Sequence, residues 1–240
     1  MFSGGLFYSI YDDVLYMFKK KQFDRLNSLY TTHMYKGVNG LIMKYCHRKL
    51  ECFKGKEKYD SVLEIGPGPA SHINFIKHKF DKFYILETSK DSIKIYENDK
   101  RINAVLYDGV NLPFENNFFD RIIISHVLEH ISDPENFLFN MMNKLKSGGL
   151  LSISLPADPG LLWRLGKLYI KHYTAKKTYG ISSREYEYLL ATEHINSIFN
   201  LIHLIRYNFK DQIEEYYLPF RVKLSDVNLF YNVHITKKDI

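Results

Sequence analysis

The chain has 240 residues, 45% of them hydrophobic and 25% charged, and its formal net charge is +6. A chain of this length and composition can bury a full hydrophobic core, which excludes the small domains that need disulfides or metals to fold. It lacks any apolar run near the roughly 20 residues of a membrane-spanning helix and any Lys/Arg block as dense as a nucleic-acid-binding arm.

Residues 1–58 are predicted to form a helical N-terminal extension, because apolar positions recur there at helical spacing, as at Leu41, Ile42 and Tyr45. The first residues lack the basic and apolar regions of a secretion signal, which predicts a cytoplasmic protein. The two cysteines, Cys46 and Cys52, match neither a CxxC nor a zinc-ligand spacing, so we expect reduced thiols.

Residues 59–240 form the main predicted domain, in which short β-rich runs alternate with helical stretches. Such alternation is typical of a parallel sheet with helices on both faces. The predicted strands are 61–65, 83–86, 104–107, 121–125 and 150–155, and the predicted helices between them are 71–79, 90–99 and 135–146.

The pattern changes after the fifth strand, at Pro156. Residues 157–192 are interpreted as an insertion, and 195–209 has the period of a helix. Two further β-rich runs, 215–222 and 228–235, are too close in sequence for a crossover helix and are predicted to be antiparallel neighbours. The expected fold is an α/β domain with a seven-stranded, mostly parallel sheet and an antiparallel final strand.

The strongest functional signal is an apolar strand that runs into Glu64-x-Gly66-x-Gly68 and then a helix. Glycines at this point allow a tight turn and a close approach of the backbone to a ligand, where a Cβ would collide. A simple strand-to-helix turn is the alternative explanation for these residues alone.

Two acids at successive strand ends favour a nucleotide-like ligand. Glu87 ends the second strand about 20 residues after the glycines, where a carboxylate can accept hydrogen bonds from ribose hydroxyls. Asp108, followed by Gly109, ends the third strand and can accept a hydrogen bond from an adenine amine. The carboxyl ends of parallel strands form the ligand-binding edge of an open α/β sheet.

These motifs, with Leu112-Pro113-Phe114, the run from Ser125 to His130 and Lys146-Ser147-Gly148-Gly149-Leu150, resemble the class I S-adenosylmethionine-dependent methyltransferases. The similarity covers about residues 59–156 and is greatest to the large branch related to ubiquinone and sugar methyltransferases. It implies a Rossmann-like fold, S-adenosylmethionine as the cofactor and S-adenosylhomocysteine as its product.

The resemblance also implies roles for individual residues. Glu64, Gly66 and Gly68 would shape the methionine side of the donor pocket, and Glu87 would hold the ribose. Asp108 with Gly109 would meet the adenine, and His126, just past the fourth strand, would line the floor under the methyl donor.

His126 and His130 have the i, i+4 spacing of a helical zinc site. The order His-Val-Leu-Glu-His, however, reverses the usual metalloprotease motif. In the family that the chain resembles, the second histidine packs a helix, and we therefore predict no metal site.

Candidate catalytic residues lie at the end of the insertion, where related enzymes build the acceptor pocket. Tyr186, Tyr188, Glu193 and His194 could each take a proton from an oxygen acceptor. For His194 the alternative is that it caps or packs the helix that follows.

The segment 161–171 is predicted to be amphipathic and basic, with Arg164, Lys167 and Lys171 on one face. It can be a lid over the acceptor site, a helix on a membrane surface or an ordinary solvated helix. We favour a lid, which would suit a small or carrier-linked acceptor that bears a phosphate or a sugar, and which leaves peripheral membrane contact open. A nucleic-acid partner is not predicted.

Two other functions use the same opening motif. An NAD(P)-dependent oxidoreductase shares the strand, the glycine turn and the acid, but Ser71 stands where its third glycine belongs. A non-catalytic, methyltransferase-like binding protein is the other alternative, although the intact donor motif argues against it.

Overall fold

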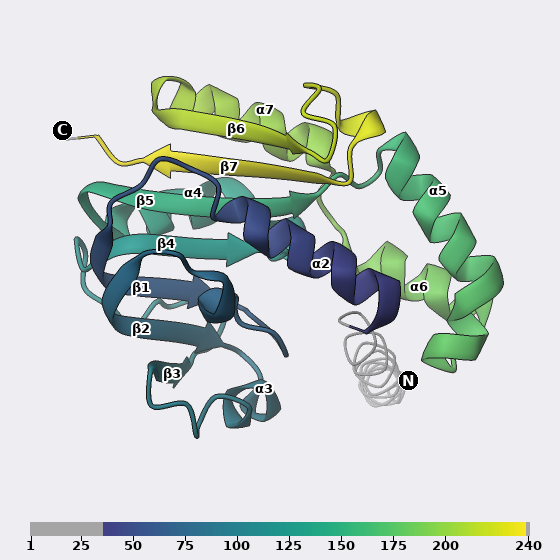
Figure 1. Ribbon diagram of the computed structural model, residues 1–240, viewed down its shortest axis with the longest axis horizontal. Helices are drawn as coiled ribbons and strands as arrows, with labels where there is room; N and C mark the ends of the chain where they lie inside the picture. Colours follow the sequence, from purple (N-terminus) through teal and green to yellow (C-terminus); the bar gives the residue numbers. More distant parts are fainter. Residues whose placement is uncertain (1–35, 239–240) are drawn as a thin grey trace, which may run out of the picture.

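The computed structural model describes residues 36–238, in which seven strands form one sheet in the order β3-β2-β1-β4-β5-β7-β6 (Figure 1). β1 to β5 pair in parallel, and β7 runs antiparallel between β5 and β6. This confirms the predicted fold class and the antiparallel closing pair. The strands are β1 (Lys58–Ile65), β2 (Lys79–Glu87), β3 (Ile102–Leu106), β4 (Phe119–Ser125), β5 (Leu145–Pro156), β6 (Ile213–Leu218) and β7 (Phe230–Thr236).

The central strand β4 is buried on both faces. Ile122, Ile123 and Ile124 are each fully buried, which explains why three consecutive apolar residues occur there. Strands covered on both sides lose the alternation of apolar and polar residues seen in half-exposed sheets.

Helices cover both faces of the sheet. α4 (Pro134–Lys144) and α7 (Ile198–Phe209) share a buried cluster with Ile122 and Ile124, while α2 (Gly37–Leu50) and η1 (His72–Phe75) pack against Ile123 on the opposite side. In Figure 1, α2 crosses in front of the sheet and α4 and α7 lie behind it. The apolar stripes of these helices supply the two halves of the core.

The segment after β5 forms a helical appendage at the carboxyl edge of the parallel strands (Figure 1). α5 (Leu161–Tyr169) continues into the π-helix η3 (Ile170–Tyr179), and α6 (Ser183–Glu193) follows. α6 starts at a capping box between Ser182 and Glu185, which satisfies two backbone N–H groups at its first turn. The remaining short elements are α3 (Lys90–Lys94), η2 (Leu128–His130), η4 (Lys210–Gln212) and η5 (Ser225–Val227).

Two predicted helices are shorter than expected. The helix predicted over 71–79 is the four-residue 3-10 helix η1, because β2 already begins at Lys79, where Lys79 and Phe80 pair with Lys58 and Tyr59 of β1. The helix predicted over 90–99 ends at Lys94. In the second case the chain continues in turns after Lys94, and β3 begins only at Ile102.

The N-terminal extension predicted over 1–58 lies partly outside the described residues, and α2 is the helix described within it. Cys46 in α2 is buried, Cys52 is exposed, and neither forms a disulfide. Across residues 36–238 the structure contains no helix that is both long and apolar enough to cross a membrane.

Candidate active site

The glycine turn after β1 adopts the conformation that its sequence predicts. Gly66 and Gly68 have φ of 58° and 57°, in the left-handed region that residues with a Cβ rarely adopt. A Cβ built on Gly66 would lie 3.1 Å from Cγ2 of Val127, in the loop after β4. Both positions thus have a backbone conformation that favours glycine, and at Gly66 a Cβ would also crowd Val127.

Glu64 lies under this turn and holds it in place. Its side chain is buried and accepts hydrogen bonds from the Ser71 hydroxyl at 2.5 Å and from the His72 backbone N–H at 2.8 Å. Burial raises the pKa of Glu64 to about 7, although both hydrogen bonds act to lower it. Glu64 thus joins the end of β1 to the start of η1.

Glu87, the last residue of β2, meets the glycine turn. Its Oε1 accepts a hydrogen bond from the Gly68 N–H at 2.6 Å, and the Tyr96 hydroxyl donates to the Gly68 carbonyl at 2.6 Å. Burial raises the pKa of Glu87. Glu87 and Gly68, 19 positions apart in sequence, are thus direct neighbours at the carboxyl edge of the sheet.

Asp108 lies in the loop after β3 and is exposed. Its carboxylate accepts hydrogen bonds from the backbone N–H groups of Asn111 at 2.7 Å and Val110 at 2.8 Å, which lower the pKa of Asp108. Gly109 has φ of 84°. Asp108 is therefore held as an ionised acceptor one strand away from Glu87.

His126 follows β4 with φ of 56°, a value uncommon outside glycine. Its ring packs edge-on against Phe230, with centroids 5.5 Å apart, and its Nε2 lies 3.6 Å from Sγ of Cys46 in α2. Burial lowers the pKa of His126 to about 3, so the ring is neutral at pH 7. His126 faces α2 and β7 and lies outside η2, so the helical pairing with His130 considered from the sequence does not form.

These residues fit an adenosyl-type ligand. The turn at Gly66 and Gly68 lets a ligand approach the backbone, and Glu87 supplies a carboxylate beside it for ribose hydroxyls. Asp108 is the next acid along the same edge of the sheet, as the sequence predicts.

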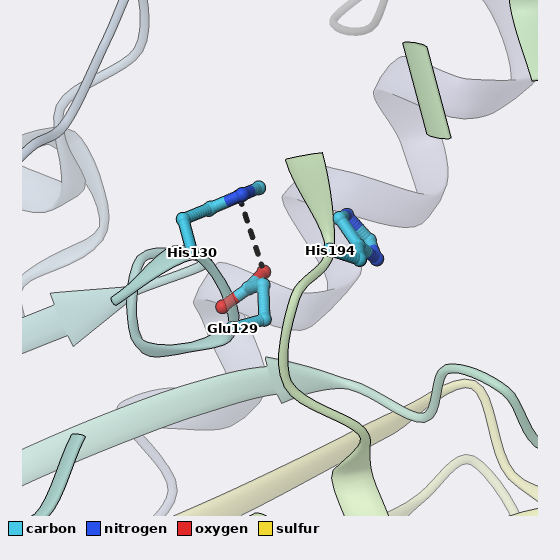
Figure 2. A group of neighbouring side chains, drawn as sticks. All are labelled: Glu129, His130 and His194. Carbon is cyan, nitrogen blue, oxygen red and sulfur yellow. Dashed lines mark ion pairs between the residues drawn. The ribbon is translucent and has the colours of Figure 1, made fainter. Parts of the chain in front are cut away.

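A second group of polar side chains gathers where the loop after β4 meets the end of α6 (Figure 2). Glu129 and His130 belong to η2, and His194 is the C-cap residue of α6. One oxygen or nitrogen atom from each residue lies within 4.8 Å of the others. The rings of His130 and His194 pack edge-on, with centroids 5.1 Å apart.

Asn196 joins the two segments that carry this group. Its backbone N–H donates to the Glu129 carbonyl at 3.0 Å, and its side-chain amide donates to the carbonyls of Leu128 at 3.3 Å and Ile131 at 2.6 Å. Three hydrogen bonds from one residue therefore position His194 against η2.

Asp158, two residues past β5, orients His194. Its Oδ2 lies 2.6 Å from Nδ1 of His194 and also pairs with the Lys167 ammonium. Burial acts to raise the pKa of Asp158, but the hydrogen bonds from His194 and Lys167 outweigh it, and the pKa lies below its ordinary value. An ionised Asp158 holds the proton of His194 on Nδ1 and leaves Nε2 as the acceptor.

Burial is the main cause of the pKa shifts of Glu129, Glu193 and His130. It raises the pKa of Glu129 to about 8 and that of Glu193 to about 7. It lowers the pKa of His130 to about 4. Several perturbed groups in one place are typical of a functional site.

The structure separates the four catalytic candidates into two sets. His194 belongs to the polar group, and Glu193 contacts that group through its backbone carbonyl, which lies 2.6 Å from Nδ1 of His130. Tyr186 is buried in the small core of the appendage with Ala175, Ile181 and Leu189, and Tyr188 is an exposed residue of α6. The sequence interpretation did not select Glu129 or Asp158, although Asp158 is an acid just past a strand end, like Glu87.

The family of methyltransferase domains matches residues 63–153, which span β1 to β5 and contain the glycine turn and both donor-side acids. A demethylmenaquinone methyltransferase of Staphylococcus haemolyticus is 29% identical over 178 residues, which cover 70% of this chain and 72% of the relative.

Solved structures show the same fold. A possible histamine N-methyltransferase from Thermotoga maritima aligns with a TM-score of 0.54 and 18% identity, covering 86% of this chain and 99% of the other. The plantazolicin methyltransferase BpumL, crystallised with S-adenosylhomocysteine, aligns with a TM-score of 0.60 and 12% identity, covering 92% and 98%.

Proposed function

Because the chain is a class I S-adenosylmethionine-dependent methyltransferase, we propose that it methylates a small or carrier-linked acceptor at the carboxyl edge of its sheet. The acceptor would bind beside the polar group of Glu129, His130 and His194. The single observation that supports this placement is the Asp158–His194 pair, which Asn196 fastens to the loop that follows β4.

The donor side would be formed by residues from the ends of four strands, β1 to β4. Gly66 and Gly68 would lie against the methionine portion, Glu87 against the ribose and Asp108 with Gly109 near the adenine, while His126 would form the floor. S-adenosylmethionine supplies an electrophilic methyl group when bound and is released as S-adenosylhomocysteine. Glu64 would act through the turn that it holds, since its carboxylate is already engaged by Ser71 and His72.

On the acceptor side, His194 is our candidate for the group that takes the proton of an oxygen or nitrogen acceptor. Asp158 fixes the tautomer and orientation of the ring, and positioning of the acceptor supplies much of the rate. Tyr188 and Glu193 would then act in acceptor binding, and Tyr186 in the packing of the appendage.

Two kinds of observation bear on the class of the acceptor. The similar proteins described above act, by their names, on a quinone and on plantazolicin, which supports a small or carrier-linked acceptor class. In α5 and η3, Lys167 pairs with Asp158 and Lys171 pairs with Glu187. Two of the three basic residues of the predicted lid are thus paired with acids of this chain, so the lid gives a phosphorylated acceptor less support than the sequence suggested.

The test is methyl-label transfer from S-adenosylmethionine into a fractionated extract of the source cell. We expect calorimetric binding of S-adenosylhomocysteine and not of NAD, and label in a fraction of small molecules, lipids or carrier-linked saccharides. Label confined to RNA or bulk protein would contradict the proposed acceptor class. Donor binding without any label would favour the non-catalytic alternative.

A further inference from the structure

Glu129, His130 and His194 form a ligand set drawn from two parts of the chain that are far apart in sequence (Figure 2). Glu129 and His130 lie in the turn after β4, and His194 arrives 64 positions later at the end of α6. With one donor atom from each residue within 4.8 Å of the others, small side-chain adjustments would bring all three onto one ion.

The two imidazoles are each held in the way that metal-bound histidines are held. Nδ1 of His130 donates to the Glu193 carbonyl at 2.6 Å, and Nδ1 of His194 donates to Asp158 at 2.6 Å. Each contact places the ring proton on Nδ1 and leaves the lone pair on Nε2. A carbonyl or carboxylate on the far nitrogen is the usual second partner of a metal-bound histidine, because it fixes the tautomer and increases the basicity of the ring.

The carboxylate of Glu129 is poorly satisfied by the protein alone. The residue is 3% exposed, and its Oε2 has no hydrogen-bond partner within the described part of the chain. Its Oε1 lies 3.8 Å from Nε2 of His130 and 3.7 Å from Nδ1 of His126, both beyond hydrogen-bonding distance. A buried carboxylate in this position is unfavourable unless a cation or a proton compensates it.

We propose that Glu129, His130 and His194 together bind one divalent transition-metal ion. Two imidazole nitrogens and one carboxylate oxygen are the donor set of catalytic zinc and of non-haem iron(II) sites, and three protein ligands leave positions open for a further ligand. Mg²⁺ and Ca²⁺ are disfavoured because they prefer oxygen donors. His130, with 36% of its side chain exposed, provides the route of entry from solvent.

The consequence for catalysis, unlike ion binding itself, rests on the function proposed above. An ion at this position would bind the acceptor's oxygen or nitrogen atom and lower its pKa, so the proton leaves to solvent. Nε2 of His194 would then be a ligand. Without an ion, Nε2 of His194 can take the acceptor's proton directly.

The test uses the full chain after treatment with a chelator, titrated with Co²⁺ and then with Zn²⁺. We expect one Co²⁺ per chain with visible d–d absorption bands, and loss of these bands as Zn²⁺ replaces the Co²⁺. Removing a residue that hydrogen-bonds to a metal ligand typically weakens metal binding 10–100-fold. Removing a ligand itself should therefore weaken metal binding at least about 100-fold. E129Q, H130N and H194A should each show this loss.

His203 provides the matched control, since it is an exposed histidine of α7. H203A should bind Co²⁺ as the unmodified chain does, and binding of S-adenosylhomocysteine reports whether each variant is folded. Co²⁺ affinity unchanged in both H130N and H194A, or no saturable Co²⁺ bands in the folded unmodified chain, would overturn the assignment. Methyl transfer measured with and without the ion separates the two proposals, because ion binding without any transfer would contradict only the function.

Discussion

The residues proposed to bind the methyl donor at the carboxyl edge of the sheet can be tested by single substitutions. Glu87 contacts the glycine turn directly, and we propose that its carboxylate binds a ribose. E87A should weaken binding of S-adenosylhomocysteine by about 1–3 kcal/mol, the range for a lost charge-assisted hydrogen bond. Calorimetric titration measures this, with exposed Glu97 changed to Ala as the control. Equal affinities for both variants would refute the ribose assignment.

The function proposed above places His194 on the acceptor side, so its loss should separate turnover from donor binding. We expect H194A to lower the methyl-transfer rate by about 100-fold or more, the scale of a lost proton-transfer group, with donor affinity preserved. Calorimetry and label transfer on the same preparation give the two quantities. Normal turnover would exclude His194 as the residue that takes the acceptor's proton.

The pKa of Glu64 predicts a pH dependence of stability. Burial raises this pKa from 4.5 to about 7, so between these values the folded chain binds more protons than the unfolded chain. Stability from Glu64 is therefore fully present below pH 4.5 and is lost as the pH rises through about 7. A pKa shift of this size corresponds to a contribution of about 3 kcal/mol to the free energy of unfolding.

E64Q removes this titration while keeping the shape of the side chain. We expect E64Q to be more stable than the unmodified chain at pH 8, with the difference shrinking towards pH 5. Urea unfolding of both proteins at the two pH values measures it. A difference in unfolding free energy that is the same at both pH values would contradict the role of Glu64 protonation.

At the scale of elements, the connection from β1 to η1 depends on backbone conformation. An alanine at Gly66 would have to adopt φ of 58° and would place its Cβ 3.1 Å from Val127. We expect G66A to lower the free energy of unfolding by about 1–2 kcal/mol and to weaken donor binding.

Gly166, in the interior of α5, is the matched control, because a Cβ there meets nothing within 4 Å. Helical alanine is favoured over glycine, so G166A should raise stability by up to about 1 kcal/mol. Chemical unfolding and titration with S-adenosylhomocysteine compare the two variants. A G66A protein as stable as G166A would show that the turn is not strained by a side chain.

At the scale of the whole molecule, a buried ionic network joins α2 and η1 to the centre of the sheet. The Arg121 guanidinium in β4 donates to Glu51 at 2.7 Å and contacts Nε2 of His78 at 2.7 Å, and His72 of η1 lies 2.7 Å from the same Glu51 oxygen. Arg121 and Glu51 are both buried. Burial acts to raise the pKa of Glu51, but His72 and Arg121 reverse this and hold it well below its ordinary value.

R121M should therefore destabilise the fold by about 3–5 kcal/mol, because it leaves the Glu51 carboxylate buried without its main partner. Arg101, whose pair with Asp99 is exposed, gives the control, and R101M should change stability by less than about 1 kcal/mol. Urea unfolding of both variants measures the contrast. If R121M and R101M lowered the free energy of unfolding by similarly small amounts, the network would contribute little to the docking of α2.

The sequence by itself determined the order of strands and helices and the donor edge, because those signals are local. Glu64, Gly66 and Gly68 lie within five positions, and Glu87 and Asp108 mark consecutive strand ends, so period and spacing were enough to relate them. Helix lengths were less predictable. η1 is short because the pairing of β2 with β1, a contact between distant residues, outweighs helical periodicity.

Only the tertiary structure brought together the polar group that we propose for the acceptor side. Glu129 and His130 are separated in sequence from Asp158 and His194, and the hydrogen bonds of Asn196 bring them together. The sequence His-Val-Leu-Glu-His reverses the metalloprotease motif, which argued against a metal site formed by His126 and His130 on one helix. In the structure His126 lies outside η2, the helix that contains His130. The site that we propose uses His194, whose approach depends on how the appendage packs against η2, which no local pattern encodes.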